Sequence, residues 1–144
     1  MQEQIIFVDS FADWSKVVDT ILPKLTNKIL VLLEGDLAAG KTTFVSKVAE
    51  RFGLKDVSSP TFSLIQSYKN SQKEIHHVDL YRLENLDEIE AIGFWEIFEQ
   101  RNSIIFVEWP SKVPEELWPL DWNIIKINIG KTENSEKRKV QIRY

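Results

Sequence analysis

LLEGDLAAGKTTF, residues 32–44, carries two of the five glycines in this 144-residue chain. Gly35 and Gly40 stand five residues apart, and Lys41 and Thr42 follow directly, which matches the phosphate-binding loop pattern G-x-x-x-x-G-K-[ST]. In such a loop the backbone N–H groups turn inward around phosphate oxygens, and the next helix directs its positive dipole end at the same anion. Since glycine makes up about 7% of residues, chance produces this match roughly once in a few hundred chains of this length.

The sequence on either side of the loop has the order that this mechanism requires. The unbroken apolar run Ile29–Leu33 is typical of a strand buried on both faces. Apolar residues then recur at helical spacing from Lys41 to Phe52, and Gly53 stands where a helix commonly ends. We therefore expect strand, loop and helix in succession, with ATP or ADP bound at the loop. The expected nucleotide-binding residues of the loop are Gly35, Asp36, Leu37, Ala38, Ala39, Gly40, Lys41, Thr42 and Thr43.

The last two specified positions of that pattern have separate chemical tasks. The ammonium of Lys41 would contact the β- and γ-phosphates, and the Thr42 hydroxyl would be a Mg²⁺ ligand. Turnover needs more than the loop, because a second acid must lie near the magnesium ion and another group must orient the attacking water.

Apolar periodicity assigns the remaining elements. Residues 10–25 predict a helix with one buried face, with Ser10 and Asp13 placed as a capping box. Alternation in 62–68 and in the following 74–83 predicts adjacent antiparallel strands. Further along, we expect two short helices or a kink around Gly93, a buried strand ended by Pro110, an ordered loop over 111–121 and a terminal hairpin.

These elements predict one domain over residues 1–144. The expected class is α/β, a P-loop NTPase-like three-layer fold in which helices cover a mixed sheet. Its core would be parallel near the nucleotide and would be extended by antiparallel strands from 62–81 and from the C-terminus.

Composition limits the classes of partner. The hydrophobic share of 43% and the charged share of 28% are ordinary for a globular protein. A net charge of −4 gives no global reason to wrap nucleic acid, and the absence of cysteine excludes a disulfide partner and a thiolate metal site. The start MQEQIIFVDS lacks the pattern of a signal peptide, and the apolar runs are too short to cross a bilayer. We expect a cytoplasmic protein with no membrane partner.

Two acidic residues at strand ends are candidates for the catalytic machinery. Glu108 ends the apolar strand of IIFVEWP, the usual place for the acid beside the magnesium ion, although it could simply be the first solvated residue. Asp79, in HHVDLYR, ends another strand and could instead pair with Arg82.

Other side chains near these strand ends give weaker signals. His76 and His77 face opposite sides of their strand and so cannot easily share a metal; we expect one to be partly buried and the other exposed. Trp109 and Tyr81 could border a base-stacking surface, or they could belong to the core.

Four motifs, GDLAAGKTTF, SSPTFSLIQSY, HHVDLYRL and IIFVEWP, resemble in order and spacing the bacterial TsaE family, also called YjeE. These are small ATPases of tRNA threonylcarbamoyladenosine biosynthesis. The resemblance covers residues from about Leu32 to Pro110. It implies slow ATP hydrolysis in support of the TsaD–TsaB complex, which transfers a threonylcarbamoyl group to an adenosine beside the tRNA anticodon. Contact with tRNA would then be indirect, through that complex.

The resemblance also implies roles for individual residues. Lys41 would be the catalytic phosphate-binding residue, Thr42 and Glu108 would bind Mg²⁺, and Asp79 would position water or support the metal site. Trp109 would lie near the nucleotide. The segment Ser59–Thr61 would sense the γ-phosphate.

One residue departs from the family pattern. The family loop reads G-D-L-G-A-G-K-T, and Ala38 stands in place of its inner glycine. If that position needs a positive φ, alanine costs about 1–2 kcal/mol, and if φ is negative the change is harmless. We expect nucleotide binding to survive.

Two other functions are compatible with a phosphate-binding loop. A small-molecule or nucleoside kinase would need an acceptor pocket and an arginine-bearing lid, whereas Arg51 and Arg101 fall at helix ends, Arg138 and Arg143 fall in the terminal hairpin, and Arg82 is the main candidate near the site. A nucleotide-switched binding module would dock partners without essential hydrolysis. The basic C-terminal stretch 131–144 could touch tRNA, or it could be a solvated hairpin.

Overall fold

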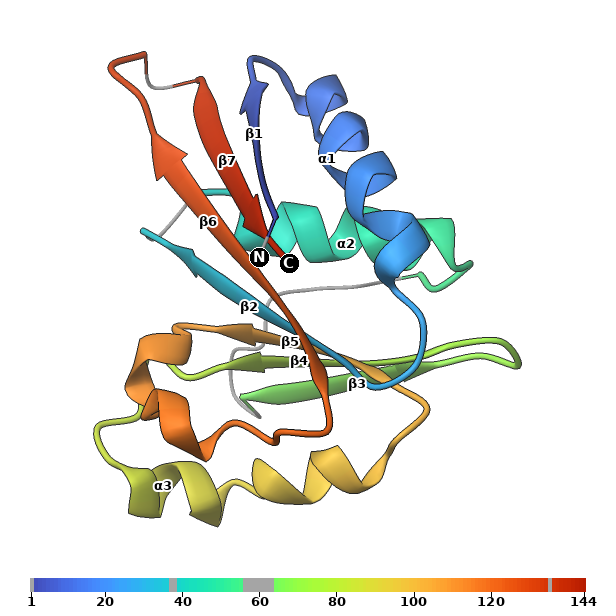
Figure 1. Cartoon of the computed structure of the whole chain (residues 1–144), viewed down its shortest axis with the longest axis vertical. Coiled ribbons are helices and arrows are strands. Elements are labelled where there is room, and N and C mark those ends of the chain that lie inside the picture. Colours follow the sequence, from blue (N-terminus) through green and yellow to red (C-terminus); the bar gives the residue numbers. More distant parts are fainter. Residues whose placement is uncertain (1, 37–38, 56–63, 135) are drawn as a thin grey trace.

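β2 (Ile29–Gly35) is buried on both faces by alternate side chains, as its apolar sequence predicts. Val31 and Leu33 belong to the core beneath α1 and α2, whereas Leu30 and Leu32 belong to a second core on the opposite face of the sheet. Figure 1 shows α1 and α2 on one side of the sheet and α3 on the other. This arrangement confirms the expected three-layer α/β fold.

The computed structural model describes residues 2–36, 39–55, 64–134 and 136–144. The strands are β1 (Glu3–Val8), β2, β3 (Ile65–Lys69), β4 (Glu74–Asp79), β5 (Ile104–Glu108), β6 (Asn123–Lys131) and β7 (Arg138–Arg143). The α-helices are α1 (Trp14–Ile21), α2 (Lys41–Arg51) and α3 (Leu86–Ala91). Short 3₁₀ helices are η1 (Phe11–Asp13), η2 (Leu22–Lys24), η3 (Trp95–Glu99), η4 (Pro110–Lys112) and η5 (Glu115–Leu117). Within the described ranges, no helix has the length and apolarity needed to span a bilayer.

The seven strands form one mixed sheet in the order β1-β7-β6-β2-β5-β4-β3. The four central strands β6, β2, β5 and β4 are parallel to one another, and β1, β7 and β3 are joined by antiparallel pairing. This confirms the expected parallel core with antiparallel extensions. The register pairs Glu108 with both Leu33 and Asp79, so the carboxyl ends of β2, β5 and β4 meet at one edge.

The first helix is shorter than its sequence pattern predicts. Residues 10–25 form η1, α1 and η2 in succession, and Pro23, which has no backbone N–H to donate, lies in η2 just after the α-helix ends. The predicted capping box is wrong, because the Ser10 side chain makes no capping hydrogen bond. The Asp13 carboxylate instead accepts a hydrogen bond from the Asp9 N–H at 3.0 Å.

β1 was missed by the sequence analysis, because MQEQIIFVDS was considered only as a possible signal peptide. Within the sheet the strand pairs with a distant partner, β7, along the full register from Glu3–Arg143 to Val8–Arg138. This pairing brings the two termini together (Figure 1), and Gln2 and Tyr144 exchange backbone hydrogen bonds of 2.7 and 3.0 Å.

Most other predicted elements are confirmed. α3 and η3 are the two short helices on either side of Gly93, and the β6–β7 hairpin closes the chain. Gly53, after α2, has a φ of +77°. The predicted loop after β5 contains η4 and η5. β3 begins at Ile65, after Leu64, which has a φ of +61°. Residues 62–63 of the predicted strand lie outside the described part of the chain.

Candidate functional site

The phosphate-binding loop approaches its neighbours so closely that two of its positions need glycine. Gly35 has a φ of +156°, and a Cβ there would lie 2.7 Å from the Ile129 carbonyl oxygen. Gly40 has a φ of +114°, and a Cβ there would lie 2.5 Å from the Trp14 ring. The loop is therefore packed between β6 and the start of α1, and only a residue without a side chain fits at either position.

Within the loop, Leu37 and Ala38 lie outside the described residues, and with them the backbone angle on which the effect of Ala38 depends. The described part turns back on itself, since the Ala39 N–H donates to the Asp36 carbonyl at 3.1 Å. Ala39 is buried and its own carbonyl accepts a hydrogen bond of 3.1 Å from Arg138 Nε.

Lys41 is a buried cation at the start of α2. Its side chain is 4% exposed, and Nζ donates to the Gly35 carbonyl oxygen at 2.6 Å. Glu108 Oε1 lies 3.8 Å from the same Nζ, and the Trp109 ring centroid lies 4.4 Å from it. Lys41 thus joins the loop to the end of β5.

Glu108 is buried, so the alternative that it is merely the first solvated residue of its strand is wrong. Its side chain is 5% exposed, and Oε2 lies 2.6 Å from His77 Nε2. An ionised carboxylate is only an acceptor, so the imidazole N–H donates in this bond. One carboxylate oxygen of Glu108 therefore accepts a hydrogen bond from His77, and the other faces the Lys41 ammonium.

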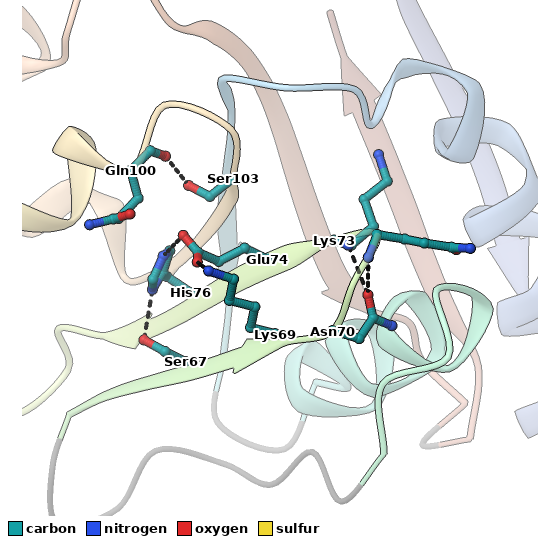
Figure 2. Close-up of polar contacts among 9 residues, drawn as sticks. Ser67, Lys69, Asn70, Lys73, Glu74, His76, Gln100 and Ser103 are labelled. Carbon is teal, nitrogen blue, oxygen red and sulfur yellow. Dashed lines mark hydrogen bonds and ion pairs between the residues drawn. The ribbon is translucent and has the colours of Figure 1, made fainter.

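The expectation that one of the two histidines is exposed is also wrong. His76 and His77 point to opposite faces of β4, as predicted, but both faces are covered and both side chains are buried. His76 contacts Ser67 Oγ at 2.7 Å and Glu74 Oε2 at 3.1 Å (Figure 2). His77 contacts Glu108, and nothing in the sequence indicated this contact.

Asp79 lies beside Glu108 on the neighbouring strand and is half-buried. Burial raises the pKa of its carboxyl above the ordinary value of 3.8, and the nearby negative charge of Glu108 raises it further. The Tyr81 N–H, which donates to Asp79 Oδ1 at 3.0 Å, and the charge of Lys41 act in the opposite direction. Asp79, Glu108 and Lys41 therefore share one electrostatic environment.

Tyr81 and Trp109 form an aromatic pair at the rim of this cluster, with ring centroids 4.9 Å apart. Tyr81 is 42% exposed, so the core alternative is wrong for it, whereas Trp109 is partly buried and packs against the second core. Trp109 has a left-handed backbone with φ +59°, and its N–H donates to the Leu33 carbonyl at 3.3 Å. The bend at Trp109 therefore sets its ring over Lys41.

The sequence matches proteins of tRNA threonylcarbamoyladenosine biosynthesis. The sequence profile described as "Threonylcarbamoyl adenosine biosynthesis protein TsaE" matches residues 8–140. The chain belongs to the TsaE family. The tRNA threonylcarbamoyladenosine biosynthesis protein TsaE of Rickettsia conorii is 34% identical over 132 residues, which are 90% of this chain and 73% of that protein. TsaE of Aquifex aeolicus is 33% identical over 132 residues, covering 86% of this chain and 93% of its own.

A solved structure supports the fold independently. The crystal structure of YdiB from Bacillus subtilis superimposes with a TM-score of 0.69 at 24% sequence identity, over 98% of this chain and 84% of the other. The profile and the sequence relatives confirm the predicted resemblance to TsaE, and the structural match confirms the predicted fold class.

Three of the four motifs that resemble TsaE meet at one edge of the sheet. GDLAAGKTTF contributes Gly35 and Lys41, HHVDLYRL contributes His77 and Asp79, and IIFVEWP contributes Glu108. In the fourth motif, Ser59, Pro60 and Thr61 lie outside the described residues.

The two threonines that follow Lys41 lie on another side of α2. Thr42 and Thr43 line a hollow together with Phe11 and Lys47, and within the described part of the chain Thr42 makes no hydrogen bond to Glu108. The roles of Thr42 and Thr43 as magnesium and nucleotide ligands remain predictions.

Two contacts of the loop were missed by the sequence analysis. Arg138 was assigned only to the terminal hairpin, but it reaches the loop carbonyl of Ala39 across 99 residues of sequence. Trp14 lies on the buried face of the first helix, and its ring also limits the space at Gly40. Neither contact has a local sequence signal, because each depends on how the sheet and α1 pack against the loop.

Proposed function

We propose that this chain binds ATP with Mg²⁺ and hydrolyses it slowly, as an accessory protein of tRNA threonylcarbamoyladenosine biosynthesis. One observation carries the proposal: the buried Lys41, which begins the helix after the loop, lies within 3.8 Å of Glu108 at the end of the neighbouring strand. A phosphate-binding lysine beside an acid at a parallel strand end is the arrangement that P-loop NTPases use. The relatives, which are named for this pathway, support the same assignment.

The residues present suit a magnesium–nucleotide complex better than a metal held by protein alone. Thr42 and Glu108 offer the hard oxygen donors that Mg²⁺ prefers, and Asp79 lies beside Glu108. Among the described residues, no group of three or more His, Asp or Glu side chains could hold a metal ion. This fits Mg²⁺, which usually binds through one or two carboxylates together with substrate phosphates.

Bound Mg²⁺ would neutralise charge on the transferring phosphoryl group. The protein's own part is to bind and orient. The N–H groups at the start of α2 and the Lys41 ammonium would hold phosphate oxygens, and Asp79, whose carboxyl pKa is raised by burial, would orient the attacking water. The Tyr81–Trp109 pair, whose rings are tilted by 41° to each other, offers an aromatic surface at the rim of the site for a nucleotide base.

The proposed partner is the TsaD–TsaB complex, with tRNA contacted through it, in the cytoplasm. The chain's net charge of −4 supports indirect rather than direct contact with tRNA. In this role the protein supplies the energy of ATP hydrolysis, and TsaD–TsaB performs the group transfer.

The binding part of the proposal is tested by calorimetric titration of ATP and ADP with and without Mg²⁺. The wild type should bind both nucleotides, and Lys41→Ala should bind at least about tenfold more weakly because a charge-assisted contact is lost. Lys55→Ala, which removes an exposed cation after α2, is the matched control and should bind as the wild type does. A wild type that binds neither nucleotide in the presence of Mg²⁺ refutes the proposal.

The pathway part is tested by reconstituting the tRNA modification with TsaD–TsaB, with and without this chain. Repeated turnover should require the wild type and should fail with Lys41→Ala. Multiple turnover without the chain would overturn the accessory role. If Glu108→Gln abolishes hydrolysis while modification continues unchanged, the protein is instead a nucleotide-switched binding module.

A further inference from the structure

The two adjacent histidines of β4 have different surroundings. His76 is satisfied at both ring nitrogens, by Ser67 Oγ at Nδ1 and by Glu74 Oε2 at Nε2 (Figure 2). His77 contacts Glu108 Oε2 through Nε2 at 2.6 Å, and its Nδ1 is buried with no hydrogen-bond partner among the residues that the structure describes. His77 thus has one strong polar contact, and that contact is with the acid of the candidate site.

The bond to His77 fixes the Glu108 carboxylate in one orientation. The His77 side chain is fully buried, between Ile75 and Asp79 on the same face of β4 and beside Phe106 on β5, so it has little room to move. Its Nε2–H donates to Oε2 of Glu108. The other carboxylate oxygen, Oε1, then faces Lys41, whose Nζ lies 3.8 Å away. Rotation of the carboxylate would break both contacts at once.

Packing alone does not explain a histidine at this position. An unpartnered polar atom in an apolar interior costs free energy, and a phenylalanine would fill similar space without that cost. The compensating contact of the imidazole is the hydrogen bond to Glu108. The side chain that fits this position best is therefore one that donates to the acid.

We infer that His77 is a positioning residue of the nucleotide site: it holds Glu108 so that Oε1 faces Lys41 and the phosphate-binding loop. The inference rests on the proposed function, in which Glu108 binds Mg²⁺ with the nucleotide. His77 itself lies behind the carboxylate and acts only through it. Its effect should therefore fall on the magnesium dependence of binding and should spare the contacts between the loop and the phosphates.

Three variants separate positioning from packing. His77→Phe keeps a buried ring without a donor, and His77→Gln keeps a side-chain N–H that can reach the carboxylate. His76→Phe is the matched control, since it removes a buried histidine from the same strand on the opposite face. Thermal unfolding confirms that each variant is folded.

The first readout is calorimetric titration of ADP at several Mg²⁺ concentrations. In His77→Phe, the Mg²⁺ concentration for half-maximal binding should rise about tenfold, as expected when a hydrogen bond to a charged group is lost. Affinity for ADP in EDTA should stay within about twofold of the wild type. His77→Gln should recover most of the magnesium dependence, and His76→Phe should match the wild type.

The second readout is NMR of the imidazole nitrogens in the protein without nucleotide. The chain has two histidines, so the variants above assign both. Glu108→Gln should shift the His77 Nε2 resonance and leave the resonances of His76 unchanged. This readout does not depend on hydrolysis, and it remains available if His77→Phe fails to fold.

The inference is overturned if folded His77→Phe has wild-type magnesium dependence, or if Glu108→Gln leaves the His77 resonance unmoved. These outcomes differ from failure of the proposed function, in which the wild type itself binds no Mg²⁺–nucleotide. In that case the inferred role of His77 fails with it, whatever the NMR spectra show.

Discussion

Substitution of the loop glycine Gly40 tests whether the packing around the candidate site requires glycine at this position. Gly40→Ala places a methyl group on a backbone with φ +114°, which costs about 1–2 kcal/mol for an L-residue. The added Cβ also lies 2.5 Å from Cζ2 of Trp14, a buried residue, and overpacking of this kind costs about 1–3 kcal/mol. We expect the free energy of unfolding to fall by about 2–5 kcal/mol.

Two other glycines separate these contributions. Gly53 shares the positive φ, at +77°, but a Cβ there meets only Asn70 Nδ2 at 3.6 Å, so Gly53→Ala should cost about 1–2 kcal/mol. Gly130, in β6, has neither feature, because its nearest contact would be 3.7 Å, and Gly130→Ala should be neutral or slightly stabilising. The series thus isolates backbone strain from steric overlap.

Urea denaturation without nucleotide measures all three variants, so any effect on ligand binding is excluded. The overlap with Trp14 is tested in the Trp14→Phe background, which removes the ring atoms nearest to the new Cβ. There the cost of Gly40→Ala should fall to that of Gly53→Ala, a coupling of about 1–3 kcal/mol. If Gly40→Ala is as stable as Gly130→Ala, or costs the same in both backgrounds, the argument from packing is refuted.

Three further predictions concern the core and the charges. Phe44→Ala should cost about 3–5 kcal/mol in urea denaturation, since the side chain is fully buried and packs edge-on against Phe106 at 6.2 Å between centroids. Because burial raises the pKa of Asp79 above 3.8, the folded state keeps that proton to higher pH than the unfolded chain, and ionisation costs stability as pH rises. Asp79→Asn should therefore be more stable than the wild type at about pH 7, and urea midpoints should converge near pH 3.5; equal midpoints at both pH values would contradict this. Mg²⁺ alone should leave the melting temperature unchanged, whereas Mg²⁺ with ATP should raise it, and an equal rise with Mg²⁺ alone would point to a metal site formed by protein groups.

The parts of the site that sequence predicted are those encoded by neighbours in the chain. The strand, loop and helix over residues 29–51 follow from local periodicity and two glycines, and Pro110 marks the end of β5. Asp79 and Glu108 could be identified as strand-end acids, but that they are neighbours depends on the pairing of β4 with β5. Local pattern finds candidate residues, and sheet order decides which of them meet.

The missed features all depend on contacts between distant segments. His77 lies 31 residues from Glu108, and the sequence HHVD gives no sign of which imidazole faces an acid. β1 has only six residues, and alternate side chains such as Ile5 and Phe7 are exposed, so its stability comes from pairing with β7 at the other end of the chain. These features become predictable only once the strand order is known.

The buried pair of Lys41 and Glu108 affects how variants of the site should be interpreted. Removing one partner leaves the other charge buried and unpaired, which typically costs about 3–5 kcal/mol, whereas replacing both by neutral groups is often harmless. Lys41→Ala could therefore lose nucleotide binding through displacement of Glu108 rather than through loss of the ammonium. Lys41→Met combined with Glu108→Gln resolves this, because it removes both charges and keeps most of the side-chain volume. We expect the double variant to unfold close to the wild type in urea and still to bind no ATP; binding restored along with stability would mean that Lys41 supports the fold of the loop and does not hold phosphate.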